Sequence, residues 1–411
     1  LGMNAIAPME GFPDAAPDLV ALVANVLVSH IRRQSGFEMA EANRMQNIMS
    51  GAIGLLVEAG KGAFSLAEVP LLFRPADRPE GKNAPTPTYN AFVSALLPQA
   101  RHSGTLSFWR DQWVTWTPPS RRDWAQSTEG RIYQYLFDER VQTATCAIEH
   151  ASLDLRAVVN QGKWLFVNLP YAYLSDTHTT LLGNLIITRI LYACMQRPPN
   201  ARPYRLILDE ARFFNTGPLD TILETARAYS LWLTLVVQSV DQLCRSREGR
   251  LDERLKELVL GLCRYFCIFH NAQDAELMAR LMFPLTGQVP MGLRVNGDWE
   301  YLPVLAEQNG HARRFIDLRE REMVFFDRLG SEPPRVWRTP EVIMDPPVES
   351  ALQRFEAAHL QRTGRPVGDI RSEIVARQKR LRETYFGEVE PQAARREPPR
   401  KHPKARYGDQ P

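Results

Sequence analysis

The spacing of apolar positions divides the chain into a helical part and a part in which strands and helices alternate. Before His150, apolar residues recur every three or four positions, as in DLVALVANVLVSHIRRQ (18–34) and EANRMQNIMSGAIGLLVEAG (41–60). This spacing is typical of amphipathic helices. We therefore predict a mostly helical domain over 17–150.

From Lys163 onward, short apolar runs read as buried strands and alternate with helical stretches. The predicted strands are KWLFVNLP (163–170), YRLILDE (204–210), LWLTLVVQ (231–238) and CRYFCIFH (263–270). The helices expected between and after them cover 177–196, 217–230, 251–262 and 274–283. Such alternation without hairpin signals predicts an α/β domain over 151–345, whose parallel sheet is covered by helices on both faces.

The chain after Pro284 is less regular. Strands are predicted at REMVFFD (321–327) and PRVWRTP (334–340), followed by a C-terminal helical segment over 346–387. The last residues, 388–411, are rich in Pro, Arg and Lys and poor in large apolar side chains, so a disordered basic tail is predicted there.

Composition adds little about partners but indicates a compartment. The formal charge of +3 neither demands nor excludes a nucleic-acid partner. Five scattered cysteines without a C-x-x-C pair argue against structural zinc and for a reducing compartment, and no long apolar run or signal peptide is present. We predict a cytoplasmic protein. Four tryptophans between Trp109 and Trp124 are interpreted as helix packing rather than as base-stacking sites.

The strongest candidate for chemistry is the acidic pair Asp209 and Glu210, which ends the apolar run RLIL. In an open parallel sheet, ligands bind at the carboxyl ends of the strands. An Asp in this position can hold a magnesium-bound water, while the Glu orients and deprotonates an attacking water. The same pair also occurs in ordinary acidic turns, so both interpretations stay open on this motif alone.

Two further side chains belong with the acidic pair. Gln238 ends the next predicted strand, where its amide would hydrogen-bond a γ-phosphate and the attacking water. Arg227 lies at the end of the helix between the two strands. It either complements the helix dipole or reaches the nucleotide of an adjoining subunit as an arginine finger.

At this point the sequence resembles a known superfamily. The segments RLILDEARFF, TARAYSLWL, TLVVQSVDQL and CRYFCIFHNAQDAELMARLM occur in the order and spacing of the HerA/FtsK hexameric motor ATPases. Within it, the chain most resembles the type IV secretion coupling proteins of the TraD/TraG kind, which pump DNA during conjugation. The resemblance covers about 108–283 well and implies a RecA-like parallel sheet, flanked by helices, with a mostly helical insertion before the Walker B strand. Residues 1–16 would then end the upstream part of the nucleotide-binding domain.

Carried over by position, the resemblance implies ATP and Mg²⁺ as cofactors. It implies Asp209 for magnesium, Glu210 for water activation, Gln238 as γ-phosphate sensor and Arg227 as a trans-acting finger. It also implies a homo-oligomeric ring, expected to be a hexamer, with DNA in its pore. Relaxase or type IV secretion components are expected as partners, and an upstream segment is expected to anchor the protein at the inner membrane. Three arginines of the helical domain are candidate phosphate contacts, with a solvated helix surface as the alternative: Arg121, Arg122 and Arg131.

A phosphate loop, G-x-x-x-x-G-K-[ST], is missing from the 411 residues. The one candidate, GLLVEAGKGAF (54–64), has five residues rather than four between Gly54 and Gly60, and Gly62 follows Lys61 where Ser or Thr is required. It also ends an amphipathic helix instead of following a strand. We interpret it as a helix C-cap and turn.

The missing loop leaves two explanations. In the first, the loop lies upstream and the chain is the C-terminal portion of an ATP-driven, DNA-translocating motor that is inactive alone. In the second, the chain is a degenerate, non-hydrolysing scaffold or docking module of a type IV secretion system. The retained acidic pair, arginine and glutamine favour the first. A secretion ATPase that acts on protein substrates is a third reading with the same core.

Overall fold

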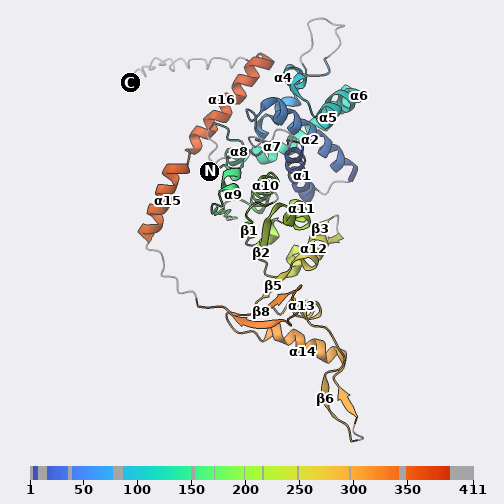
Figure 1. Cartoon of the computed structure of the whole chain (residues 1–411). Helices are drawn as coiled ribbons and strands as arrows, with labels where there is room; N and C mark the ends of the chain where they lie inside the picture. The colour runs from blue at the N-terminus through green and yellow to red at the C-terminus, as the bar shows by residue number, and fades with distance from the viewer. Residues whose placement is uncertain are drawn as a thin grey trace, which may run out of the picture.

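The structure is a computed structural model with a mostly helical α/β architecture (Figure 1). It describes residues 3–7, 16–35, 39–76, 87–149, 153–170, 172–198, 200–214, 217–247, 250–295, 298–341 and 349–388. Within these ranges, no helix is both long enough and apolar enough to cross a membrane.

The helical part is built around two long helices, which confirms the helices predicted over 18–34 and 41–60. The amphipathic helix α1 packs against α2 on one side and against helices of the α/β part on the other. The helices of this part are α1 (Ala16–Ser35), α2 (Met39–Gly60), α3 (Val69–Leu72), α4 (Ala91–Leu96), α5 (Ser103–Ser107), α6 (Trp113–Thr115), α7 (Pro118–Leu136), α8 (Glu139–Thr145) and α9 (Leu155–Asn160). Shorter turns are the 3-10 helices η2 (Leu66–Glu68) and η3 (Leu97–Gln99) and the π-helix η4 (Phe108–Gln112).

The tryptophan-rich segment forms core, as the sequence predicted. Trp109 is fully buried, and its indole Nε1 donates a hydrogen bond to the carbonyl of Gly51 at 3.0 Å. Gly51 is required there, because a Cβ atom at this position would lie 2.1 Å from the ring of Phe108. The rings of Trp116 and Trp124 meet edge to face with centroids 4.7 Å apart. These rings hold α2 against the segment from α5 to α7.

Two of the candidate phosphate contacts are engaged inside the helical part. Arg121 donates to the backbone carbonyls of Trp116 and Thr88 at 2.9 and 3.3 Å. Arg131 forms an ion pair with Glu41 at 3.1 Å. Arg122 remains exposed. The first two arginines therefore have a structural role in this fold, and only Arg122 presents its charge to solvent.

The turn after α2 confirms the C-cap reading of the sequence around Lys61. The backbone N–H of Lys61 bonds to the carbonyl of Val57 at 3.2 Å, and both Lys61 and Gly62 are left-handed, with φ of 47° and 95°. A lysine in this conformation places its Cβ close to its own backbone carbonyl, whereas glycine does not.

Replacing Lys61 with Gly is therefore expected to raise the free energy of unfolding by about 0.5–1 kcal/mol. Urea denaturation followed by circular dichroism measures the change. The neighbouring variant Gly62→Ala serves as the control, because it introduces a Cβ at positive φ and should lower the free energy of unfolding. A Lys61→Gly variant that is less stable than the wild type would contradict this account of the turn.

In the residues that the structure describes, the α/β part contains one parallel strand pair. Strand β1 (Tyr204–Leu208) pairs in parallel with β2 (Leu231–Leu235), with Leu206 opposite Leu233. Between them the chain forms α11 (Gly217–Thr225), and α10 (Asp176–Met195) precedes β1. In Figure 1, α10 and α11 lie between this pair and the helical part. Ile207 and Trp232 are 60% and 55% exposed, so the opposite face of the pair is open.

The continuous parallel sheet that the sequence predicted is not seen in the described residues. Residues 163–170 are irregular rather than a strand, and Trp164 and Phe166 are 87% and 84% exposed. Strand β5 (Tyr265–Ile268) pairs antiparallel with β8 (Glu322–Asp327), not in parallel with β2. The physical reason is that an apolar run becomes a strand only where a neighbour offers hydrogen-bonding groups, and the run itself does not choose that neighbour or its direction.

The remaining elements extend this second sheet. Strand β9 (Arg335–Arg338) pairs antiparallel with β8, so the order is β5-β8-β9. Two hairpins are also present, β3 (Arg245–Arg247) with β4 (Arg250–Asp252) and β6 (Pro290–Leu293) with β7 (Trp299–Tyr301). The helices here are α12 (Arg254–Leu262), α13 (Ala275–Met282) and α14 (Val304–Ile316). The helix α14 lies in a stretch that the sequence left irregular.

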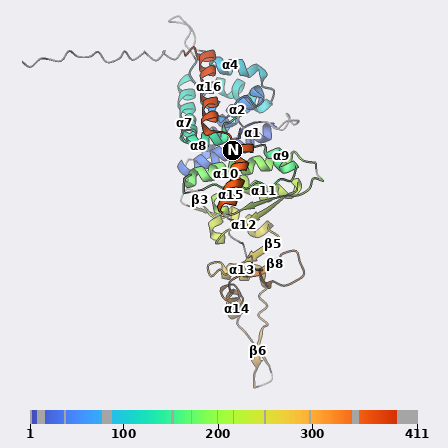
Figure 2. The same ribbon diagram turned by 90° about the vertical axis from the view of Figure 1, so that its left-hand side faces the viewer.

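The C-terminal helices return to the beginning of the chain. These are α15 (Glu349–Thr363) and α16 (Val367–Phe386), both at the positions predicted. Figures 1 and 2 show α16 alongside the helical part. Arg377 of α16 is buried there and donates to Glu68 at 3.1 Å and to Glu373 at 2.6 Å. The tail predicted to be disordered lies, from residue 389 onward, outside the described residues.

Candidate nucleotide site

The acidic pair lies where the parallel strands end. Backbone hydrogen bonds continue past the last residue of β1. The N–H of Val236 donates to the carbonyl of Leu208 at 2.9 Å, and the N–H of Ala211 donates to the carbonyl of Val236 at 3.0 Å. Asp209 and Glu210 therefore sit at the carboxyl edge of the pair. Glu210 is left-handed, with φ of 50°, and leads into the 3-10 helix η5 (Ala211–Phe214). A non-glycine residue held in this region is uncommon and is concentrated at functional sites.

Gln238 meets Glu210 at this edge. Its amide Nε2 donates a hydrogen bond to Glu210 Oε1 at 2.7 Å, across 28 positions of sequence. On the other carboxylate oxygen, Arg212 Nε lies 3.1 Å from Glu210 Oε2. Asp209 Oδ1 accepts the backbone N–H of Glu210 at 3.0 Å. The structure thus gathers Asp209, Glu210 and Gln238 into one cluster, open to solvent on one side.

The loop that carries Gln238 is fixed by a second set of contacts. The backbone N–H of Gln238 donates to Gln242 Oε1 at 3.2 Å, and its carbonyl accepts from Asn271 Nδ2 at 3.3 Å. The carboxylate of Asp274, only 4% exposed, accepts from Asn271 at 2.9 Å and from the backbone of Val240 at 2.9 Å. This loop includes the 3-10 helix η7 (Val240–Leu243). The segments after β2 and after β5 are therefore tied together at the edge that holds the acidic pair.

Sequence reasoning did not single out these supporting residues. Asn271 and Asp274 do stand inside the motif CRYFCIFHNAQDAELMARLM, so a signal was present in the DA pair. Arg212 and Gln242 likewise stand inside RLILDEARFF and TLVVQSVDQL, the second as the first residue of the QL pair. Their importance follows from where the turns after β1 and β2 place them.

Arg227 is not brought to this cluster. It lies in the 3-10 helix η6 (Ala226–Tyr229), immediately before the first residue of β2, whereas Gln238 follows the last one. A five-residue strand spans about 13 Å between its end residues. The exposed Arg227 side chain therefore stands at the opposite edge of the strand pair from Glu210.

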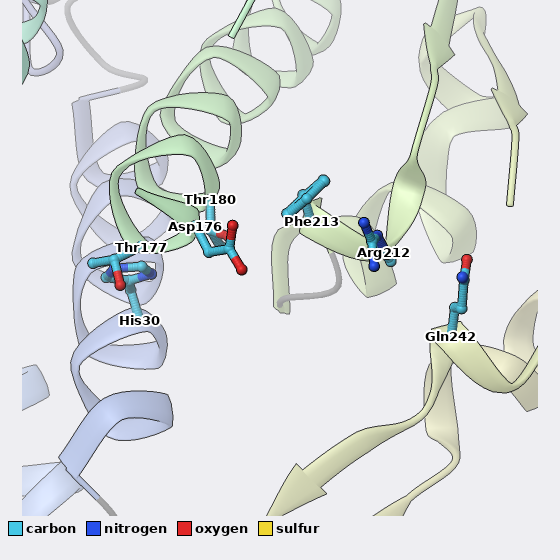
Figure 3. Close-up of a pocket in the computed structure, with 7 residues that line it drawn as sticks. All are labelled: His30, Asp176, Thr177, Thr180, Arg212, Phe213 and Gln242. Carbon is cyan, nitrogen blue, oxygen red and sulfur yellow. The ribbon is translucent and has the colours of Figure 1, made fainter. Parts of the chain in front are cut away.

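A cavity of about 490 Å³ opens beside the cluster (Figure 3). One side is formed by α1 and the start of α10, and the other by η5 and η7. It is lined by His30, Asp176, Thr177, Thr180, Arg212, Phe213 and Gln242. Arg212 and Gln242 are the link to the site, because they also contact Glu210 and Gln238. The volume lies in the range of small-molecule sites.

The oxygen ligands at the cluster would bind magnesium only if a bound nucleotide supplied further ligands. Among the described residues, no group of three or more His, Cys, Asp or Glu side chains is placed to hold a metal ion. Magnesium in nucleotide sites is held by one or two carboxylates, waters and phosphate oxygens rather than by a cage of protein ligands. The exposed carboxylate of Asp209 fits this mode of binding.

No protein-family profile and no curated protein matches the sequence. Two solved structures share the fold at 13% sequence identity. One is an unbound form of the bacterial conjugative coupling protein TrwB, with a TM-score of 0.51 over 84% of this chain and 72% of that one. The other is the plasmid coupling protein TrwB in complex with the non-hydrolysable GTP analogue GDPNP, with a TM-score of 0.52 over 84% and 73%. The chain therefore has the fold of a conjugative coupling protein, as its sequence motifs predicted.

Proposed function

We propose that this chain is the water-activating portion of an ATP-driven motor that moves DNA, of the conjugative coupling kind. The observation that carries the proposal is the hydrogen bond between Gln238 and Glu210 at the carboxyl ends of two parallel strands. The fold shared with TrwB and the nucleotide analogue bound to that protein support the same proposal.

In this proposal each residue of the cluster has one task. Glu210 orients the attacking water and accepts its proton, while Gln238 donates to the γ-phosphate and to the same water. Asp209 is the side chain that would hold Mg²⁺ together with the nucleotide. ATP, when bound, supplies the phosphoryl group that is transferred. In the present arrangement the Gln238 amide is bonded to Glu210, so nucleotide binding would require it to turn from the carboxylate toward a phosphate oxygen.

The phosphate loop that this chemistry requires is not among the 411 residues. We propose that it lies upstream in the same polypeptide. The position of Arg227 bears on the oligomeric state. This residue lies at the edge of the strand pair opposite Glu210, so it cannot reach a nucleotide bound beside the Glu210 of its own chain. As an arginine finger, Arg227 would therefore act on the nucleotide of a neighbouring subunit, which fits hydrolysis at the interfaces of a homo-oligomeric ring. We propose that this ring is a hexamer, located in the cytoplasm at the inner membrane.

DNA-stimulated ATP hydrolysis tests this proposal. The product of the whole gene should hydrolyse ATP several-fold faster with DNA than without it, and the 411-residue chain alone should show no turnover that depends on Glu210. Activity of the 411-residue chain that is lost in Glu210→Gln would overturn the need for an upstream loop. A whole-gene product that binds its secretion partners but never hydrolyses ATP would instead identify a scaffold.

A further inference from the structure

Three aromatic side chains cross one face of the sheet β5-β8-β9. In the antiparallel register, Cys267 lies opposite Phe325, and Phe325 opposite Arg335. Directly opposed residues share a face, and so do residues two apart in one strand. Tyr265, Phe325 and Trp337 therefore stand on one face, one on each strand.

The rings form a diagonal row. The centroids of Tyr265 and Phe325 are 6.0 Å apart with their planes inclined by only 19°, and those of Phe325 and Trp337 are 5.3 Å apart with planes inclined by 44°. Such offsets are favourable for aromatic pairs and hold the rings in a defined arrangement. We refer to Tyr265, Phe325 and Trp337 as the aromatic row.

The two faces of this sheet are buried to very different extents. On the opposite face, Phe266 and Val324 are 7% and 1% exposed and belong to the core that also contains Phe315 of α14, although Val336 of the edge strand β9 is 58% exposed. On the face of the aromatic row, Tyr265 and Trp337 are 56% and 53% exposed. Large aromatic side chains gathered on an open face mark a site of interaction rather than a part of the core.

Arginines accompany the aromatic row. The guanidinium of Arg264 lies over the Tyr265 ring, 4.8 Å from its centroid, and donates from Nε and Nη2 to Asp327 at 3.0 and 2.9 Å. Arg335, opposite Phe325, pairs with Glu332 at 2.6 Å. Both arginines are about half exposed, with side-chain exposures of 50% and 57%. The Arg335–Glu332 pair is exposed on both partners and therefore weak, so phosphate oxygens can replace Glu332. Arg264 is held by two hydrogen bonds to Asp327, which is only 23% exposed, and it keeps that partner.

Exposed aromatic rings beside arginine side chains are suited to binding nucleic acid in particular. Bases stack on aromatic rings through faces that every base possesses, and the phosphates between them meet arginine. In a duplex those base faces are already stacked on each other, so the aromatic row can engage only an unpaired strand. An apolar peptide could cover the rings, but it would make no use of the arginine beside them.

We propose that the aromatic row, with Arg264 and Arg335, binds single-stranded nucleic acid by stacking. This inference deepens the proposed function, on which it rests for the identity of the strand as DNA. The aromatic row lies on a different sheet from Glu210, so its binding can be measured without ATP.

Fluorescence anisotropy of a labelled oligothymidine of about 12 nucleotides, without ATP, tests the proposal on the 411-residue chain. Trp337→Ala and Tyr265→Ala should each weaken binding at least about fivefold, in keeping with the loss of one stacked base. Trp337→Phe, which keeps a ring, should retain most of the affinity. Trp299→Ala is the matched control, because Trp299 is also a strand tryptophan and is 55% exposed.

The outcomes separate this inference from the proposed function. Equal affinity of wild type, Trp337→Ala and Trp299→Ala would overturn the stacking site, and so would duplex DNA bound as tightly as the single strand. A change in oligomeric state of Trp337→Ala with unchanged oligonucleotide affinity would also overturn it and would assign the row to protein contact. Unchanged oligonucleotide binding by the Glu210→Gln variant supports a binding site separate from the site of hydrolysis. If the whole-gene product does not hydrolyse ATP but the aromatic row still binds the oligonucleotide, the proposed function fails and this inference holds.

Discussion

Replacing Glu210 with Gln is expected to slow ATP hydrolysis by the whole-gene product by about 10²–10⁴-fold. The amide is nearly the same size and can still accept the hydrogen bond that Gln238 donates to Glu210 Oε1 at 2.7 Å. It cannot accept a proton from the attacking water. The loss should therefore appear in the rate of the chemical step, with nucleotide affinity nearly unchanged, and is measured by phosphate release at saturating ATP.

The matched control for this substitution is Glu356→Gln. Glu356 is an exposed carboxylate on α15, outside the loops that carry and support the cluster. It should leave the rate of hydrolysis unchanged. Equal rates for Glu210→Gln and the wild type would remove Glu210 from the mechanism, and equal losses in both variants would point to a general effect of charge or folding.

Replacing Arg377 with Met is expected to lower the free energy of unfolding by about 3–5 kcal/mol near neutral pH. Arg377 is 7% exposed and is the cation of a buried cluster that contains Glu68 and Glu373. It also donates to Ser65 Oγ at 3.0 Å and to the carbonyl of Cys146 at 3.1 Å. Its removal takes away the guanidinium that pairs with both of these buried carboxylates. Urea denaturation of the variant and the wild type measures the loss.

The pH dependence of this loss has a definite sign. Burial raises the pKa of Glu68 above its ordinary value of 4.5, and the charge of Arg377 opposes that rise. Without Arg377 the pKa should rise further. A carboxyl whose folded pKa exceeds its unfolded pKa contributes stability below the unfolded value and loses it as the pH rises through the folded value. The variant should therefore be least destabilised near about pH 4.5 and most destabilised near about pH 7.

Two further variants test the cause of the Arg377 effect. Arg380→Met removes an exposed arginine from the same helix and should change the free energy of unfolding by less than about 0.5 kcal/mol. Adding Glu68→Gln to Arg377→Met should restore part of the stability, because one unpaired charge disappears. A destabilisation that is the same at both pH values and is not relieved by Glu68→Gln would show that lost packing, not uncompensated charge, is responsible.

Local periodicity made the long helices predictable, and strand direction made the contact at the candidate site predictable. The segments 18–34 and 41–60 repeat their apolar positions at helical spacing, so α1 and α2 follow from the sequence alone. Gln238 meets Glu210 because the carboxyl ends of parallel strands share an edge. The order and the type of these elements can be predicted from the sequence, and they are sufficient to place the two side chains at one edge.

Features that depend on distant partners were not predictable. The apolar run over 163–170 resembles a strand, but no strand pairs with it in the described part of the chain. The helix α14 was missed because its sequence, VLAEQNGHARRFI, includes Asn309 and Gly310, which favour turns. The burial of Arg377 depends on Glu68, which lies 309 positions earlier. No local pattern distinguishes such an arginine from its exposed neighbours on the same helix.

The central claim is that Asp209 and Glu210 form one half of an ATP site whose other half is a phosphate loop in the same polypeptide. Determining the gene sequence on the 5′ side of the codon for Leu1 tests it most directly. The account predicts an apolar strand followed by G-x-x-x-x-G-K-[ST] in the upstream reading frame. An initiation codon next to Leu1 with no such loop before it would contradict the account and would leave the acidic pair as a relic in a scaffold protein.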